Sequence, residues 1–314
     1  MRRRRGESLR ISSLLLSTLA TLWPSPVRGR TESFGAEPGS LEYDHAYAVD
    51  QYQRKVRSGL GLPDPPTFWG RRVLELGCGH GGISCFLAGL GARQVMGVDL
   101  NHRHLRCAQR LKTRIERESD RPLPVSFQLM DGFSLAFADA TFDVVLVDNV
   151  FEHLTDPTAA LREIRRVLHS GGWLLIPIFS SIKSKYGLHL KHGLKVPWAN
   201  LLFSEETIVD ALRRQARRHP QLREIYPHLD TATTVAGVRR HGDLNNLTYG
   251  RFRALATEQG FRVCYFQTHA TLAGKVMRRL FPRLERTILG DILSVGAAVV
   301  LTALPRQGED SCGL

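Results

Sequence analysis

Short apolar runs of strand length recur along the middle of the chain, as expected for strands buried on both faces of a sheet. The first five runs occupy residues 72–76, 94–99, 124–130, 142–148 and 173–179. Two more, at residues 261–268 and 295–304, are separated by a basic amphipathic helix that Pro282 interrupts. Between the first five runs, apolar positions return at helical spacing, as from Leu105 to Ile115. This alternation predicts an α/β fold with a seven-stranded, mostly parallel sheet and helices on both faces.

Capping residues mark the ends of several predicted helices. Asp156 followed by Pro157 is a cap with a first-turn proline, and the Ser-Gly-Gly sequence at residues 170–172 predicts the end of that helix. Thr248 caps a second helix. Residues 42–60, with three tyrosines and alternating charges, predict a third helix ahead of the core. These signals support the alternation of helices and strands.

The segment at residues 180–247 interrupts this alternation with an irregular, basic and polar sequence, in which residues 205–218 predict a helix. Its candidate functional side chains are Tyr186, His189, His192 and Trp198. The two histidines lack a nearby carboxylate partner, so no metal site is predicted. A long polar insertion after the fifth strand is a place where a substrate lid can form. We expect a lid here, and the alternative is that these residues only pack the insert onto the sheet.

The first 40 residues are predicted to be a leader ahead of a domain at residues 41–304, which a tail at residues 305–314 follows. Residues 1–30 hold seven arginines and one glutamate, and a mostly apolar stretch covers residues 9–23. That stretch is too short and too rich in serine and threonine to predict a membrane span. The leader is therefore interpreted as disordered, as a targeting sequence or as an interfacial membrane anchor.

The chain is strongly basic, with a formal net charge of +13. Such a charge favours nucleic acid, acidic lipid or an anionic substrate as a partner. No helix-turn-helix, zinc finger or aromatic-and-basic platform indicates specific nucleic-acid binding. The five cysteines are scattered and odd in number, which is typical of a reducing compartment. We expect a cytoplasmic protein, with membrane association through the N-terminal leader as the alternative.

The most informative motif is the glycine-rich loop after the first strand, V-L-E-L-G-C-G-H-G-G at residues 73–82. Glycines allow a sharp turn and a close approach of backbone to ligand, and the helix that follows begins with unpaired N–H groups. From Gly77 to Gly82 the loop matches the dinucleotide fingerprint G-x-G-x-x-G. From Glu75 to Gly81 it also matches E-x-G-x-G-x-G. The loop alone therefore predicts a nucleotide site without choosing the nucleotide.

A carboxylate at the end of the second strand supports nucleotide binding. Asp99 lies 20 residues after Gly79, where its two oxygens can accept hydrogen bonds from both ribose hydroxyls. NAD enzymes share this feature, so Asp99 also leaves the cofactor open. Its alternative role is that of a helix cap.

Four motifs follow one another along the central part of the chain. They are the loop at residues 73–82, M-D-G-F-S-L-A-F-A-D at 130–139, F-D-V-V-L-V-D-N-V-F-E-H-L at 142–154 and L-R-E-I-R-R-V-L at 161–168. In this order they resemble the motifs of the class I S-adenosylmethionine (SAM)-dependent methyltransferases, in their small-molecule type 11 group. The resemblance covers roughly residues 70–180 and implies a Rossmann-like fold. One departure is Ala136, where a proline is usual in the family.

The resemblance implies SAM as the cofactor and assigns its contacts. Asp131 would accept a hydrogen bond from the adenine amino group, while Asp148 and Asn149 would face the methionine moiety. The full set of predicted cofactor-binding residues is Glu75, Gly77, Cys78, Gly79, Asp99, Leu100, Asp131, Gly132, Asp148 and Asn149. Cys78 is interpreted as a small residue that fits the loop and not as a nucleophile.

The predicted function is methyl transfer from SAM to a small-molecule or lipid-like acceptor. His153, which follows the fourth strand, is the candidate general base, and its alternative role is to pack and begin the next helix. An anionic or aromatic acceptor would suit the basic, aromatic insert. The alternative functions are an NAD(P)-dependent Rossmann oxidoreductase and a non-catalytic, membrane-associated module on the same fold.

Overall fold

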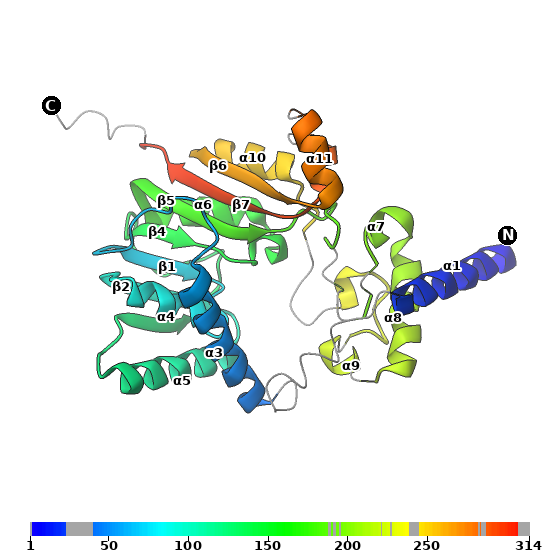
Figure 1. The fold of residues 1–314 in the computed structure, drawn as a ribbon, viewed down its shortest axis with the longest axis horizontal. Helices are drawn as coiled ribbons and strands as arrows, with labels where there is room; N and C mark the ends of the chain where they lie inside the picture. The colour runs from blue at the N-terminus through cyan, green and yellow to red at the C-terminus, as the bar shows by residue number, and fades with distance from the viewer. Residues whose placement is uncertain are drawn as a thin grey trace.

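A seven-stranded sheet lies at the centre of the computed structural model (Figure 1). The backbone is described for residues 2–22, 40–187, 190, 193–194, 196–220, 222–226, 228–238, 245–281, 283 and 287–306. Side chains are described for these residues except 2–10, 22, 224, 225 and 236. His189, His192 and Pro282 therefore lie outside the described residues.

Five parallel strands form one part of the sheet, as predicted. They are β1 (Arg72–Leu76), β2 (Gln94–Asp99), β3 (Val125–Leu129), β4 (Phe142–Leu146) and β5 (Leu168–Phe179). β6 (Phe261–Ala270) and β7 (Ser294–Ala303) complete it, with β7 antiparallel to both of its neighbours. The strand order is β3-β2-β1-β4-β5-β7-β6, so the order reverses between β1 and β4. Ligands of such sheets bind at this switch point, beyond the carboxyl ends of the strands.

The helices between the parallel strands begin close to the predicted positions. They are α4 (Gly82–Gly89), α5 (His102–Ser119) and α6 (Pro157–Val167). Asn101 caps α5, and Asp156 caps α6 by accepting hydrogen bonds from two backbone amides. The predicted end of α6 at the Ser-Gly-Gly sequence is wrong. The helix ends at Val167 because Leu168 already pairs with Phe142 as the first residue of β5.

Apolar side chains fill both faces of the sheet. On one face, α3 (Leu41–Ser58), α4 and α5 pack through residues such as Leu87 and Leu111. On the other face, α6 and α10 (Tyr249–Glu258) pack through residues such as Phe252. Helices on both faces of a mostly parallel sheet confirm the predicted fold class.

The insert between β5 and α10 has an apolar core of its own. Its helical segments are α7 (Ala199–Leu202), α8 (Glu205–Arg218), α9 (Leu222–Ile225) and the 3-10 turn η2 (Ala236–Val238). The predicted helix at residues 205–218 is confirmed as α8. Buried residues of this core include Leu194, Leu212 and Leu229.

The N-terminal helix α1 (Arg2–Leu22) packs on α8 (Figure 1). Leu16 and Ala20 are buried in the core of the insert, and the side-chain amide of Gln215 donates to the Ser17 carbonyl at 2.6 Å. The prediction of a disordered leader is therefore wrong for residues 13–20, because one face of this stretch is buried against the insert. Targeting and anchoring stay predictions. Within the described ranges, no helix is both long and apolar enough to cross a membrane.

The connection between β6 and β7 contains α11 (Leu272–Leu280) and α12 (Ile288–Ile292). The predicted basic amphipathic helix is confirmed as α11. Because β7 runs antiparallel to β5, its first residues lie beside the last residues of β5, as the pairing of Phe179 with Ala297 shows. This connection therefore lies at the same edge of the sheet as the carboxyl ends of the parallel strands.

Candidate functional site

The loop after β1 turns through glycines with left-handed backbone conformations. Gly77 and Gly79 have φ angles of 71° and 53°. A Cβ atom at Gly77 would lie 2.5 Å from the Val150 side chain, whereas nothing lies within 4 Å of the corresponding position at Gly79. Gly77 is therefore required by packing, and Gly79 leaves open space in which a ligand can approach the backbone.

Asp99, at the carboxyl end of β2, is hydrogen-bonded to this loop. One carboxylate oxygen accepts from the Gly79 amide and the other from the Asn101 amide, both at 2.9 Å. The Nδ1 atom of His104 lies 3.3 Å from the second oxygen. Burial acts to raise the pKa of Asp99, but these hydrogen bonds outweigh it, and the pKa lies below its usual value. Since Asn101 caps α5, the alternative role of Asp99 as the helix cap is wrong.

Glu75, in β1, lies beneath the loop and is 2% exposed. Its carboxyl group accepts a hydrogen bond from the Ser84 hydroxyl. Burial raises the pKa of Glu75 to about 8, and the charge of Asp148 adds to this shift. Cys78 is also buried, and burial raises the pKa of its thiol well above the usual value. The thiol is thus a poor nucleophile, which agrees with its interpretation as a small residue that fits the loop.

Asp148 follows β4 and forms an ion pair with Lys55 of α3. The Lys55 Nζ and Asp148 Oδ2 atoms are 3.3 Å apart, and the two side chains are 16% and 10% exposed. The other oxygen, Oδ1, is buried and has no hydrogen-bond partner among the described residues. Burial raises the pKa of Asp148, and the ion pair with Lys55 opposes this. An ion pair with one unused acceptor oxygen therefore lies at the switch point of the sheet.

Helix α3 contributes residues that the sequence analysis did not assign to the site. The Gln51 side chain lies against the loop, where a Cβ atom added at Gly82 would lie 2.6 Å from its Oε1. Tyr47 packs edge-to-face on His80 of the loop, with 5.3 Å between ring centroids. The sequence does contain a signal that α3 faces the site, because polar residues recur at helical spacing along one face of this helix. They are Asp44, Tyr47, Gln51 and Lys55.

The remaining predicted cofactor residues lie on the turns after β2, β3 and β4. Asp131 is exposed, and its carboxylate accepts a hydrogen bond from the Phe133 amide at 3.0 Å. Leu100 is 69% exposed. Gly132 is buried, and Asn149 has a left-handed φ of 58°. In the described part of the chain, neither Asp131 nor Leu100 shares a hydrogen bond with another predicted site residue.

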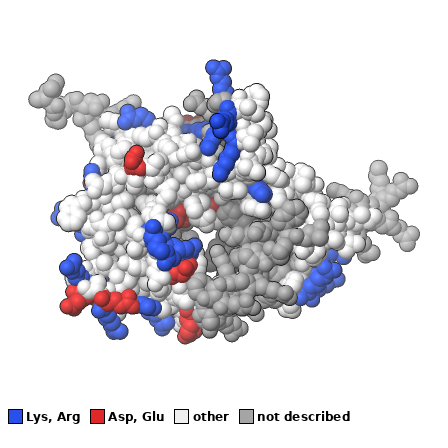
Figure 2. Space-filling model, in the orientation of Figure 1, with Lys and Arg blue, Asp and Glu red and all other residues white. Residues whose placement is uncertain are grey.

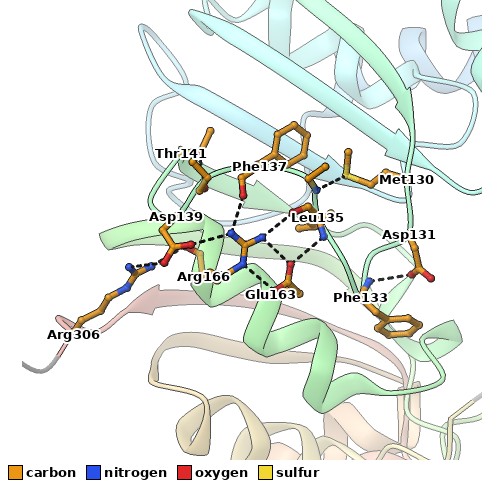
Figure 3. A network of polar contacts seen from close by, with 12 residues as sticks. Met130, Asp131, Phe133, Leu135, Phe137, Asp139, Thr141, Glu163, Arg166 and Arg306 are labelled. Atoms are coloured by element: carbon orange, nitrogen blue, oxygen red, sulfur yellow. Dashed lines mark hydrogen bonds and ion pairs between the residues drawn. The ribbon is translucent and has the colours of Figure 1, made fainter.

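Arg166 of α6 holds the loop after β3 (Figure 3). Its guanidinium donates to the carbonyl oxygens of Leu135 and Phe137 at 2.8 and 2.7 Å and pairs with two carboxylates at 2.9 Å each. In the same loop, the Ala136 amide donates to the Met130 sulfur at 3.4 Å, which a proline could not do. The motif at residues 161–168 contains Arg166 but did not predict that this side chain fixes the loop.

His153 lies half-buried in the short 3-10 turn η1 (Phe151–His153), directly after the Asp148 segment. Asn245, at the end of the insert, holds this turn. Its side-chain amide donates to the carbonyl oxygens of Phe151 and Leu154 at 2.8 and 2.9 Å. The end of the insert is therefore fixed to the turn that carries His153. The role of His153 as a base stays a prediction.

Two of the four singled-out insert residues, Tyr186 and Trp198, are described. The Lys185 ammonium lies 5.3 Å from the ring centroid of Tyr186 and 5.9 Å from that of Trp198. The Trp198 indole N–H donates to the Ile292 carbonyl at 2.7 Å. Trp198 therefore packs the insert onto the connection between β6 and β7, which favours the packing alternative for this residue.

Comparison with known proteins identifies the central part of the chain. Residues 74–176 match a family model described as Methyltransferase domain. Ajmaline N-methyltransferase of Rauvolfia serpentina is 33% identical over 115 residues, which cover 37% of this chain and 38% of that protein. The ubiquinone biosynthesis O-methyltransferase of Cereibacter sphaeroides is 35% identical over 129 residues, which cover 41% and 49%. The chain thus spans less than half the length of these relatives.

A solved SAM-dependent methyltransferase from Methanosarcina mazei is 19% identical, with a TM-score of 0.47 over 75% of this chain and 93% of that one. The segment that matches the family model runs from β1 into β5 and contains the glycine loop, Asp99, Asp131 and Asp148. Residues 74–176 therefore match the methyltransferase domain family, and the predicted resemblance to the class I SAM-dependent, type 11 group is confirmed for this segment of the chain.

Proposed function

We propose that this chain transfers a methyl group from SAM to a small-molecule acceptor. The observation that carries the proposal is the buried ion pair of Lys55 and Asp148 beside the glycine loop. SAM has an amino-acid end with one positive and one negative charge, and a paired ammonium and carboxylate can bind both. NAD(P) instead has an anionic pyrophosphate, which the Asp148 carboxylate would repel. The geometry favours SAM over a dinucleotide.

The residues present fit SAM. Gly79 leaves open space above the loop, and the charged Asp99 carboxylate would accept hydrogen bonds from the ribose hydroxyls. The unpartnered Oδ1 of Asp148 would accept a hydrogen bond from the methionine amino group, while Lys55 would bind the methionine carboxylate. Asp131, exposed on its turn, would accept a hydrogen bond from the adenine amino group.

Bound SAM supplies an electrophilic methyl group on a sulfonium sulfur. The chain's own residues must bind the acceptor, hold its nucleophilic atom in line and exclude water. His153 is our candidate for removal of a proton from the acceptor, since it lies half-buried on the turn after Asp148. Within a domain of residues 41–304, the insert at about 180–247 is our candidate for the lid over the acceptor.

The acceptor we propose is anionic, aromatic or lipid-like. The net charge of +13 would attract an anion, and Lys185, Tyr186 and Trp198 join a cation with two aromatic rings. The names of the two relatives refer to N-methylation of ajmaline and to O-methylation in ubiquinone biosynthesis, and both are small-molecule reactions. A cytoplasmic location is proposed because SAM is an intracellular cofactor.

Calorimetry with S-adenosylhomocysteine and with NADH tests the cofactor. We expect micromolar binding of S-adenosylhomocysteine and no binding of NADH, and the reverse result would establish the oxidoreductase alternative. Methyl-labelled SAM incubated with small-molecule extracts then tests transfer. Label that enters an extracted compound supports the enzyme, whereas cofactor binding without transfer to any fraction supports the non-catalytic module.

A further inference from the structure

The connection between β6 and β7 exposes large apolar side chains in one row. Leu272, Val276 and Leu280 of α11 are 82%, 52% and 63% exposed. They recur every four residues and therefore share one helix face. Phe281 and Leu289 of the same connection are 55% and 41% exposed. Such a concentration of exposed apolar side chains is typical of an interaction surface.

The opposite side of α11 is tied to the body of the protein. Gly274 is buried, and a Cβ atom there would lie 2.4 Å from the Leu293 carbonyl oxygen. The amide and the hydroxyl of Thr271 both donate to that oxygen, at 2.8 and 2.9 Å. Leu272 and Val276 are each two residues from Gly274, which is about 200° around the helix. The close contact at Gly274 therefore fixes the apolar row outward.

Basic side chains lie beside this row. Lys275 and Arg279 are exposed, and no carboxylate of the described residues forms an ion pair with either of them. Between residues 272 and 289, the sequence has five basic residues and one acidic residue. Figure 2 shows Lys and Arg side chains gathered at the top of the molecule, at the place of α11 in Figure 1. The surface is thus both apolar and positively charged.

This surface lies at the functional edge of the sheet, as the pairing of β5 with β7 shows. The insert contacts the same connection. The Lys185 amide donates to the Ser294 carbonyl at 2.9 Å, and the Trp198 indole donates to the Ile292 carbonyl. Whatever binds α11 therefore lies next to the proposed lid.

We propose that the outward face of α11 docks on an anionic phospholipid bilayer. Its apolar row would enter the boundary between headgroups and acyl chains, while Lys275 and Arg279 contact lipid phosphates. A bilayer accepts projecting aliphatic side chains without a complementary groove, and its negative surface matches the charge of this face. The nine residues of α11 lie on the surface and do not cross it. Docking does not depend on methyl transfer, although it would suit a lipid-like acceptor.

Vesicle co-sedimentation of the full chain tests the proposal. The vesicles are phosphatidylcholine alone, or phosphatidylcholine and phosphatidylglycerol in equal parts. One variant combines Leu272→Ser, Val276→Ser and Leu280→Ser, and a second combines Lys275→Gln and Arg279→Gln. The matched control replaces three exposed apolar residues outside α1, α11 and the insert, which are 56%, 43% and 38% exposed. They are Val56→Ser, Leu90→Ser and Leu304→Ser.

We expect the wild-type protein to bind the anionic vesicles and not the neutral ones. Both α11 variants should bind at least about tenfold more weakly, and the control variant should bind like the wild type. Affinity for S-adenosylhomocysteine should stay unchanged in all of them, which separates docking from the proposed function. Wild-type vesicle binding by either α11 variant would overturn the proposal. So would a wild-type protein that binds no vesicles but forms a dimer that the α11 variants lose in ultracentrifugation.

Discussion

Asp99 and Asp148 occupy comparable positions, beyond the carboxyl ends of the two strands that flank β1. Their surroundings differ. Asp99 accepts two backbone hydrogen bonds and lies near His104, and its pKa is lowered. Asp148 has one ion-pair partner, from a helix far away in the sequence, one unpartnered oxygen and a raised pKa.

The difference shows that one site can contain a carboxylate whose hydrogen bonds are already formed, Asp99, and one that still has an unpartnered oxygen, Asp148. The fold itself stabilises the charge of Asp99, so this carboxylate is charged and oriented for the proposed ribose contact before a ligand binds. The fold stabilises the charge of Asp148 incompletely, and an incompletely paired buried charge costs free energy. We expect a ligand amino group to complete the partners of Asp148, and therefore to stabilise this part of the protein most.

The largest expected effect concerns the pH dependence of stability that Glu75 causes, since the charge of Asp148 helps to raise the pKa of Glu75. The pKa of Glu75 is about 8 in the folded state, against an ordinary value of 4.5. Between these pH values the folded state binds more protons than the unfolded state, so stability falls as pH rises, by up to about 1.4 kcal/mol per pH unit. Glu75→Gln does not titrate, so its melting temperature should fall less between mildly acidic and alkaline pH. Parallel curves for the two ligand-free proteins would refute this.

The next largest effect concerns Asp99. Asp99→Ala removes charge-assisted hydrogen bonds to the ribose, and the loss of even one is worth roughly 1.5–3 kcal/mol. Affinity for S-adenosylhomocysteine, measured by calorimetry, should therefore fall at least about tenfold. Asp131→Ala is the comparison variant. Because Asp131 is exposed, its proposed hydrogen bond to adenine should be weaker, and the loss of affinity should be smaller. A folded Asp99→Ala protein with unchanged affinity would show that Asp99 serves only the loop.

The ion pair of Lys55 and Asp148 is tested with two ligands. Lys55→Met should weaken binding of S-adenosylhomocysteine about tenfold, since one charge-assisted contact to the methionine carboxylate is lost. Binding of methylthioadenosine, which lacks the amino-acid group, should stay unchanged. Arg54→Met is the matched control, because Arg54 is the next residue of α3 and its side chain is 50% exposed. Equal losses for both ligands would mean that Lys55 supports the fold and not the methionine end.

The sequence predicted the strands closely because apolar runs and caps are local signals. All seven predicted strands are present, six of them close to their predicted bounds, and Asp156 and Thr248 cap helices as predicted. The start of β5 was missed because the glycines at 171 and 172 are local signals for a helix end. Pairing with β4, which no local pattern contains, extends the strand back to Leu168.

Long-range packing also explains what was missed around the site. Asp99 was predicted because it ends a strand, and Asp148 because its motif resembles that of the family. Lys55 was not predicted, because its place depends on how α3 packs on the loop. The partner of α1 is even more distant along the sequence, since Ser17 of α1 and Gln215 of α8 are 198 residues apart. A single sequence shows that a helix face exists, but not what covers it.

The smallest expected effect concerns the insert. It tests whether the insert supports the proposed cofactor site around Asp99 and Asp148 or only covers the acceptor. Trp198→Phe keeps the aromatic ring but removes the hydrogen bond to Ile292, which costs about 1 kcal/mol, or about 2–4 °C in melting temperature. Affinity for S-adenosylhomocysteine should stay nearly unchanged, because the proposed cofactor contacts come from the sheet and α3, while turnover should fall if the insert is the lid. Trp69→Phe, at a residue that is 77% exposed, is the matched control and should change neither quantity. If cofactor affinity falls together with turnover in Trp198→Phe, the insert supports the cofactor site itself and the lid assignment is wrong.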